Sequence, residues 1–136
     1  MTLIDAGPLI ALIDKGQAVA HQQCLEAQRS LTGPLLTTWP CFTEAMYFLG
    51  HLGGWRGQAA LWSFVTQITL LLHTPSSTET SRMQALMEKY KDVPMDLADA
   101  SLVSLAEASG LKQVFTLDTD FYIYRIAGKE GFDVIP

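Results

Sequence analysis

Short apolar segments alternate with segments of helical spacing along the whole chain, and this alternation limits the possible folds more than any other feature. Strands are expected at residues 3–5, 35–38, 68–72, 113–117 and 132–135. Helices are expected between them, at residues 8–13, 18–30, 39–50, 55–65, 76–90 and 96–109. Strands separated by helices pair in parallel, and helices then cover both faces of the sheet. The sequence therefore predicts a three-layer α/β/α sandwich around a central, mainly parallel sheet of four or five strands.

Composition supports one folded unit. The 136 residues are 49% hydrophobic and 17% charged, which excludes disorder of the whole chain and predicts a single domain over residues 1–136. With 14 acidic and 9 basic residues the net charge is -5, so the overall basic charge of a general nucleic-acid binder is absent. Any contact with nucleic acid would need a local patch of basic residues.

The cysteines and the N-terminal segment indicate the cellular compartment of the protein. Cys24 and Cys41 lie among apolar residues without a CxxC spacing, so we interpret them as buried small hydrophobes rather than disulfide or zinc ligands. The N-terminal segment has no basic region and carries Asp5 and Asp14, which argues against a signal peptide or a membrane span. We expect a cytoplasmic protein with no membrane contact.

Two acidic positions follow predicted strands. Asp5 closes the first strand and Asp118 the fourth, with Asp120 two residues further on. Ligand sites of open parallel sheets lie beyond the carboxyl ends of the strands, so these side chains are candidates for chemistry. Aspartates at strand ends also form turns and cap helices, and that interpretation is equally good for either one alone.

Three further carboxylates lie in predicted helices. Glu44 is the only ionisable residue of an otherwise apolar helix, where it is either a partnered buried acid or part of a narrow solvent stripe. Asp96 and Asp99 are three residues apart and share a helical face. Asp96 fits an N-cap at least as well as a functional role, whereas Asp99 shares the apolar face that should pack on the sheet.

These acids predict a metal site. A parallel α/β fold would bring Asp5, Glu44, Asp99 and Asp118 to one edge, where such crowding is unfavourable without a cation. Oxygen ligands suit Mg²⁺ or Mn²⁺, and Asp96 and Asp120 are additional candidate ligands. None of the three histidines lies beside these acids in the sequence, so zinc is not expected.

The ordered set of motifs resembles the PIN-domain ribonucleases of the VapC toxin type. The matching pieces are Ile4-Asp5 with Pro8 to Leu12, Thr43-Glu44, Ala98 to Val103, and Phe115 to Asp118 with Phe121. The resemblance implies a metal-dependent endoribonuclease that cleaves RNA, commonly a homodimer and often neutralised by a cognate antitoxin protein. It implies that Asp5, Glu44, Asp99 and Asp118 are the catalytic acids and that Thr116 is the hydroxyl residue before the last acid. Ala6-Gly7 departs from the family, which often has a hydroxyl residue there.

Two other functions fit the same architecture. A phosphoacceptor receiver domain would need paired acids after the first strand, where Asp5 stands alone. A catalytically silent PIN-like binding module would act through protein partners, with Tyr47, Phe48, Trp55 and Trp62 as an interaction face, although helical spacing would also place these aromatics in the core. Four acids in the expected order favour the enzyme.

Overall fold

The central sheet is parallel throughout. The computed structural model describes all residues 1–136 and contains five strands, β1 (Thr2–Ile4), β2 (Leu35–Thr38), β3 (Leu70–His73), β4 (Gln113–Phe115) and β5 (Asp133–Ile135). Their order across the sheet is β3-β2-β1-β4-β5. In the centre, Leu3 of β1 lies opposite Leu36 of β2 and Val114 of β4. The predicted parallel sheet is confirmed.

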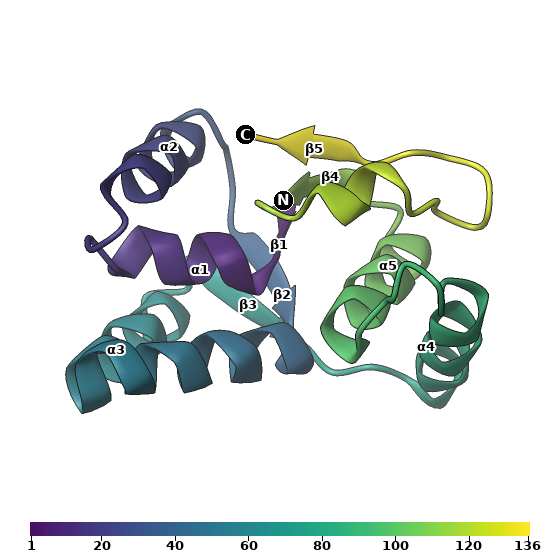
Figure 1. Cartoon of the computed structure of the whole chain (residues 1–136), viewed down its shortest axis with the longest axis horizontal. Helices are drawn as coiled ribbons and strands as arrows, with labels where there is room; N and C mark the ends of the chain where they lie inside the picture. Colours follow the sequence, from purple (N-terminus) through teal and green to yellow (C-terminus); the bar gives the residue numbers. More distant parts are fainter.

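Helices form the two outer layers. They are α1 (Ala6–Ile13), α2 (Ala18–Arg29), α3 (Trp39–Thr66), α4 (Ser77–Lys89) and α5 (Leu97–Ser109), with the 3₁₀ helix η1 (Thr119–Tyr122) after β4. Figure 1 shows α1, α2 and α3 on one side of the sheet, with α4 and α5 packed together on the other. The predicted α/β/α sandwich is therefore confirmed. No helix combines the length and the apolar character that crossing a bilayer would require.

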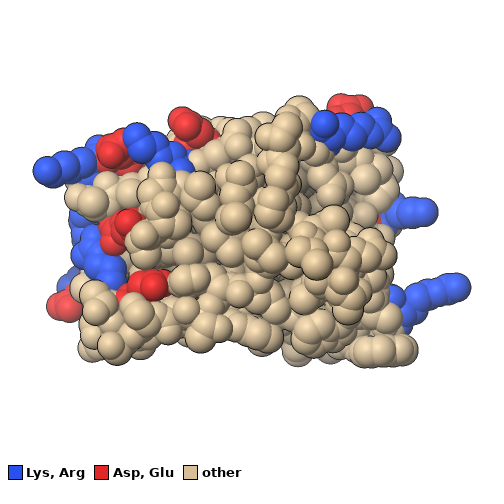
Figure 2. Space-filling model, turned by 180° about the vertical axis from the view of Figure 1, so that it is seen from behind, with Lys and Arg blue, Asp and Glu red and all other residues tan.

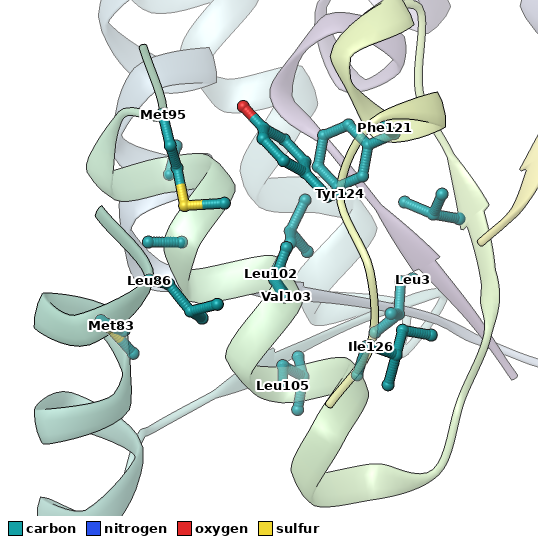
Figure 3. Packing of buried hydrophobic residues seen from close by; sticks show 14 of the residues in the cluster. Leu3, Met83, Leu86, Met95, Leu102, Val103, Leu105, Phe121, Tyr124 and Ile126 are labelled. Carbon is teal, nitrogen blue, oxygen red and sulfur yellow. The ribbon is translucent and has the colours of Figure 1, made fainter. Parts of the chain in front are cut away.

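Each face of the sheet has its own hydrophobic core. Leu3 of β1 belongs to the core beneath α4 and α5, whereas the next residue, Ile4, belongs to the core beneath α1 and α3. Val114 and Phe115 of β4 divide in the same way, because successive strand residues point to opposite faces. Figure 3 shows the first core, to which Leu102 and Leu105 of α5 and Leu3 of β1 all belong.

Several helix ends follow the expected local chemistry. Ser76 accepts a hydrogen bond from the Glu79 amide and its own amide donates to the Glu79 side chain, a complete capping box before α4. Gly110 ends α5 with a φ of 76°, the left-handed conformation predicted for it. Asp5 caps α1, so this helix begins two residues before Pro8, the residue expected to open it.

Other boundaries differ from the prediction. The interval expected between two helices at residues 51–54 narrows to one residue, because only Gly54 (φ 58°) departs from helical geometry within α3. The third strand begins at Leu70 instead of residue 68, since Ile68 turns the chain with a φ of 61°. The fourth strand ends at Phe115, two residues earlier than expected.

The strand order reverses direction at β1. The chain moves from β1 outward to β2 and β3, and then returns to place β4 and β5 on the other side of β1. The helices that follow the first half cover one face and those of the second half cover the other (Figure 1). A crevice is expected beyond the carboxyl ends of β1 and β4, and a hollow lies there, lined by residues that follow both strands. Asp5 and Asp118 are the acids of this crevice.

Candidate metal centre

Asp5 is held at the switch in strand order by bonds to both of its carboxylate oxygens. It is buried, its Oδ1 accepts a hydrogen bond from the Ala6 amide at 2.7 Å, and its Oδ2 accepts one from the Thr116 hydroxyl at 2.8 Å. The Thr116 hydroxyl oxygen also accepts a hydrogen bond from the Asp118 amide at 3.0 Å. A single hydroxyl thus connects the acid after β1 to the acid after β4.

Asp99 projects from a helix that is buried nearly all round. Residues Ala98 to Ala106 of α5 are all buried, and Asp99 itself is only 6% exposed. Its Oδ2 accepts a hydrogen bond at 2.8 Å from the hydroxyl of Tyr124, a side chain with no exposed surface. Figure 3 shows the Tyr124 ring among apolar side chains, with its hydroxyl at the margin of the cluster. This bond satisfies one oxygen of Asp99, and no side chain or amide bonds the other.

Asp118 completes a group of three carboxylates. Its Oδ1 accepts a hydrogen bond from the Asp120 amide at 2.9 Å, which stabilises the turn into η1. One carboxylate oxygen from each of Asp5, Asp99 and Asp118 lies within 4.8 Å of the others. Oxygens of three acids from three separate segments therefore converge on a space of the size that one cation occupies.

A hollow of about 270 Å³ surrounds this group, and we call it the acid hollow. Its lining includes all three clustered acids together with Glu44 and Asp96, and no Lys or Arg. Asp96 is the N-cap of α5, one of the two roles that its sequence context left open, and its Oδ1 accepts a hydrogen bond from the Asp99 amide at 2.8 Å. Asp120 does not line the hollow and instead supports Asp118 through its backbone.

Burial and mutual repulsion disfavour ionisation in the hollow. The pKa of Asp99 is raised from 3.8 to about 7, chiefly by desolvation and also by the charges of Asp96, Asp5 and Asp118, while the Tyr124 hydrogen bond lowers it. Desolvation is also the main cause that raises the pKa of Asp5 and of Glu44. The acids repel one another with no protein cation among them, which is the electrostatic condition that a divalent cation relieves.

A buried hydroxyl pair fixes α5 against the start of α3. The Ser101 hydroxyl donates to the Ala98 carbonyl at 2.7 Å, and the Thr38 hydroxyl lies 2.6 Å from the Ser101 oxygen. Thr38 in turn caps α3 by accepting from the Cys41 amide. These bonds set the distance between the helix that carries Asp99 and the helix that carries Glu44.

Sequence reasoning did not find Tyr124. The predicted aromatic segment at 121–126 contains it, but neither spacing nor composition indicates that this hydroxyl reaches Asp99, which lies 25 residues away. The available signal was Asp99 itself, because an acid on an apolar helix face requires a buried partner. Cys24 and Cys41 are free and buried, as predicted, and the Cys41 sulfur lies 3.8 Å from Asp5 Oδ1.

The fold and the acid hollow together define a class: α/β/α proteins with an acidic site at the switch in strand order. The sequence matches the family described as PIN domain over residues 2–128, and the chain belongs to this family. No curated protein matches the sequence.

Solved structures with a similar fold include a toxin and two complexes. The chain is similar to VapC20 of Mycobacterium tuberculosis, described as a Sarcin-Ricin loop cleaving toxin, with a TM-score of 0.86, 17% identity and full coverage of both chains. It is also similar to a toxin-antitoxin complex from Klebsiella pneumoniae, with a TM-score of 0.64 and 21% identity over 88% of each chain. A DNA-bound VapBC from Salmonella typhimurium matches with a TM-score of 0.56 and 18% identity over 96% of each chain.

Proposed function

We propose that this protein is a metal-dependent endoribonuclease that acts as the toxin of a toxin-antitoxin pair. The observation that carries the proposal is the convergence of Asp5, Asp99 and Asp118 within 4.8 Å in a hollow without any basic lining residue. Membership of the PIN domain family and the likeness of the fold to VapC toxins support the choice of RNA as substrate. No observation favours a catalytically silent binding module.

The donor set fits Mg²⁺ or Mn²⁺. Every candidate ligand is a carboxylate, and hard oxygen donors in a partly open site suit a cation that keeps several waters. Asp5, Asp99 and Asp118 would hold the ion, with Glu44 and Asp96 on the rim of the same hollow. When bound, such an ion lowers the pKa of a coordinated water and stabilises negative charge on a phosphate.

The protein's own groups prepare this site. Thr116 and the Ala6 amide hold Asp5 in one orientation, and Tyr124 holds Asp99. Glu44 carries a raised pKa at the rim, where it can accept a proton from water beside the substrate. We assign this role to Glu44 because, of the two acids of the hollow outside the three that converge, Asp96 is already engaged as the N-cap of α5.

Purified protein should cleave single-stranded RNA when Mg²⁺ or Mn²⁺ is present, and cleavage should stop when EDTA is added. The reason is that the clustered acids cannot bind a phosphate without a cation between them. A time course on a labelled RNA measures this, with Mn²⁺ added back in excess over EDTA as the control. Cleavage that continues undiminished in EDTA would refute the metal mechanism.

Replacement of Tyr124 by phenylalanine should weaken metal binding by about 10-fold to 100-fold, the usual effect of losing a group that orients a metal ligand. The ring stays packed while the bond to Asp99 is lost, and the pKa of Asp99 then rises because that bond lowers it. Calorimetric titration with Mn²⁺ measures the affinity.

Tyr90→Phe is the matched control for this variant. Its ring packs on Tyr124 at 5.1 Å between centroids, but its hydroxyl accepts a hydrogen bond from the Arg125 amide, away from the acids. Equal Mn²⁺ affinity in the two variants would show that Tyr124 has no effect on the site beyond packing.

The partner proposals rest on the same likeness. We propose a cognate antitoxin that places a basic side chain among the acids of the hollow, since an arginine can bind carboxylates in a bidentate manner and displace the metal. A homodimer and a cytoplasmic location belong to the same proposal. Cys24 and Cys41 are both buried and form no disulfide, as expected for a protein of a reducing compartment.

A further inference from the structure

The acid hollow adjoins an open groove that aromatic and apolar side chains line in large part. This groove, of about 670 Å³, has walls formed by Trp39, Pro40 and Tyr47 of α3 and by Leu97 of α5, and it shares Glu44 and Asp96 with the acid hollow. We call it the aromatic groove. Because the two hollows share these residues, they are neighbours on the surface, and a chain bound in the first has the second beside it.

The groove has the wrong charge for a phosphate and the right surface for a base. Its lining contains two carboxylates and no Lys or Arg, so a negatively charged backbone finds no partner in it. Figure 2 shows that, on the face opposite the view of Figure 1, Lys and Arg gather at the periphery and leave the middle uncharged, so that face offers no basic path either. Within the groove, binding energy for RNA must therefore come from contacts other than ion pairs, and base stacking on an aromatic ring is uncharged.

Two aromatic rings offer exposed surface in the groove while being held in place. Trp39 is 43% exposed, packs edge-on against Phe42 at 5.8 Å between ring centroids, and begins α3. Tyr47 is 63% exposed and packs edge-on against His51 at 4.5 Å. Because neighbouring side chains already hold both rings in place, a base that stacks on them costs little side-chain conformational entropy.

We propose that the aromatic groove is a subsite for an unpaired nucleobase next to the scissile phosphate, stacked on Trp39 with Tyr47 beside it. This inference rests on the proposed nuclease function. A phosphate at the acids places the neighbouring base one nucleotide away, and the shared wall of Glu44 and Asp96 directs it into the groove. The subsite selects for single-stranded RNA, because a paired base has no free face to stack.

The test compares kcat and KM of Trp39→Ala, Trp39→Phe and wild type on an unstructured RNA oligonucleotide with Mn²⁺. Trp39→Ala should raise KM by about 5-fold to 150-fold, the usual effect of losing one base–aromatic stack, with kcat little changed. Trp39→Phe should restore most of the affinity. Trp55→Ala is the matched control, because Trp55 is a tryptophan of the same helix that is 69% exposed and does not line the groove.

A binding measurement separates this inference from the proposed function. Fluorescence anisotropy of the labelled RNA, alone or annealed to its complement, reports binding by Asp5→Asn proteins with and without Trp39→Ala. The Trp39→Ala loss should appear with the single strand and disappear with the duplex. Equal affinity of the two proteins for the single strand, or an equal loss of affinity for single strand and duplex, would overturn the base subsite. An effect of Trp39→Ala that appears only in the binding of a protein partner would overturn it as well. Failure of wild type to cleave RNA with metal would instead refute the nuclease, while the anisotropy result still decides the subsite.

Discussion

Asp5→Asn will lower metal-dependent RNA cleavage by about 100-fold or more, because loss of a ligand removes several kcal/mol of charge stabilisation in the transition state. Asp5 stands at the switch in strand order, and both of its oxygens are already oriented by Ala6 and Thr116. An asparagine keeps the size of the side chain and one acceptor oxygen, so the fold should survive while the charge is lost. Initial rates at saturating Mn²⁺, with circular dichroism as a check of folding, measure the effect.

The same experiment distinguishes among the remaining acids. Glu44→Gln, Asp99→Asn and Asp118→Asn should also lose most activity. Asp96→Asn should lose less, because asparagine can still cap α5. Asp120→Asn is the internal control, because its amide supports Asp118 while its side chain lies outside the acid hollow. Wild-type cleavage by a folded Asp5→Asn protein would refute the proposed centre.

Asp99→Asn will melt at a higher temperature than wild type in metal-free buffer near pH 8, and this advantage will shrink as the pH is lowered toward 4. The folded protein holds a proton on Asp99 up to a pH of about 7, against a usual pKa of 3.8. Because the folded state binds more protons in this interval, the contribution of Asp99 to stability falls as the pH rises from about 4 to about 7. Asparagine has no carboxyl group to ionise, so the variant does not lose this stability, and its amide oxygen can still accept the Tyr124 hydrogen bond.

Addition of Mn²⁺ should reverse the order of the two proteins. Wild type should gain about 2.7 kcal/mol at a hundredfold excess of metal over its dissociation constant, a rise in Tm of about 10 °C for a chain of this size. Asp99→Asn should gain less, since it lacks one ligand. Thermal melts at several pH values with EDTA and with Mn²⁺ measure both effects. The difference in Tm between the two proteins at each pH cancels the contributions of the other titrating groups, which the proteins share. A variant that is less stable at every pH, with or without metal, would make Asp99 a structural acid.

Periodicity was sufficient to predict the layers but not the details of the turns. Alternation of strands and helices is a property of the chain itself, so the parallel sheet and its two helical covers could be predicted. The position of Asp120 could not, because it depends on β4 ending at Phe115 and on the turn into η1 that follows. The prediction of one domain over residues 1–136 stays a prediction.

In the candidate site, too, the placement of the acids could be predicted, whereas the contacts that orient them could not. Asp5 and Asp118 could be placed together because parallel strands end at one edge, and Asp99 because an acid on an apolar face is costly. The contacts that orient them could not be placed, since the bond from Thr116 to Asp5 spans 111 residues and depends on side-chain packing. Long-range hydroxyl contacts of this kind have no periodic signature in a sequence.

The switch in strand order also determines when during synthesis the acid cluster can form. Asp5 and Glu44 belong to the half of the sheet made first, whereas Asp99 and Asp118 come from the half made last. A growing chain that has not yet emerged past β4 lacks the third clustered carboxylate and the hydroxyl of Thr116 that aligns the first. The proposed metal centre therefore cannot assemble on a nascent chain until translation has passed Asp118.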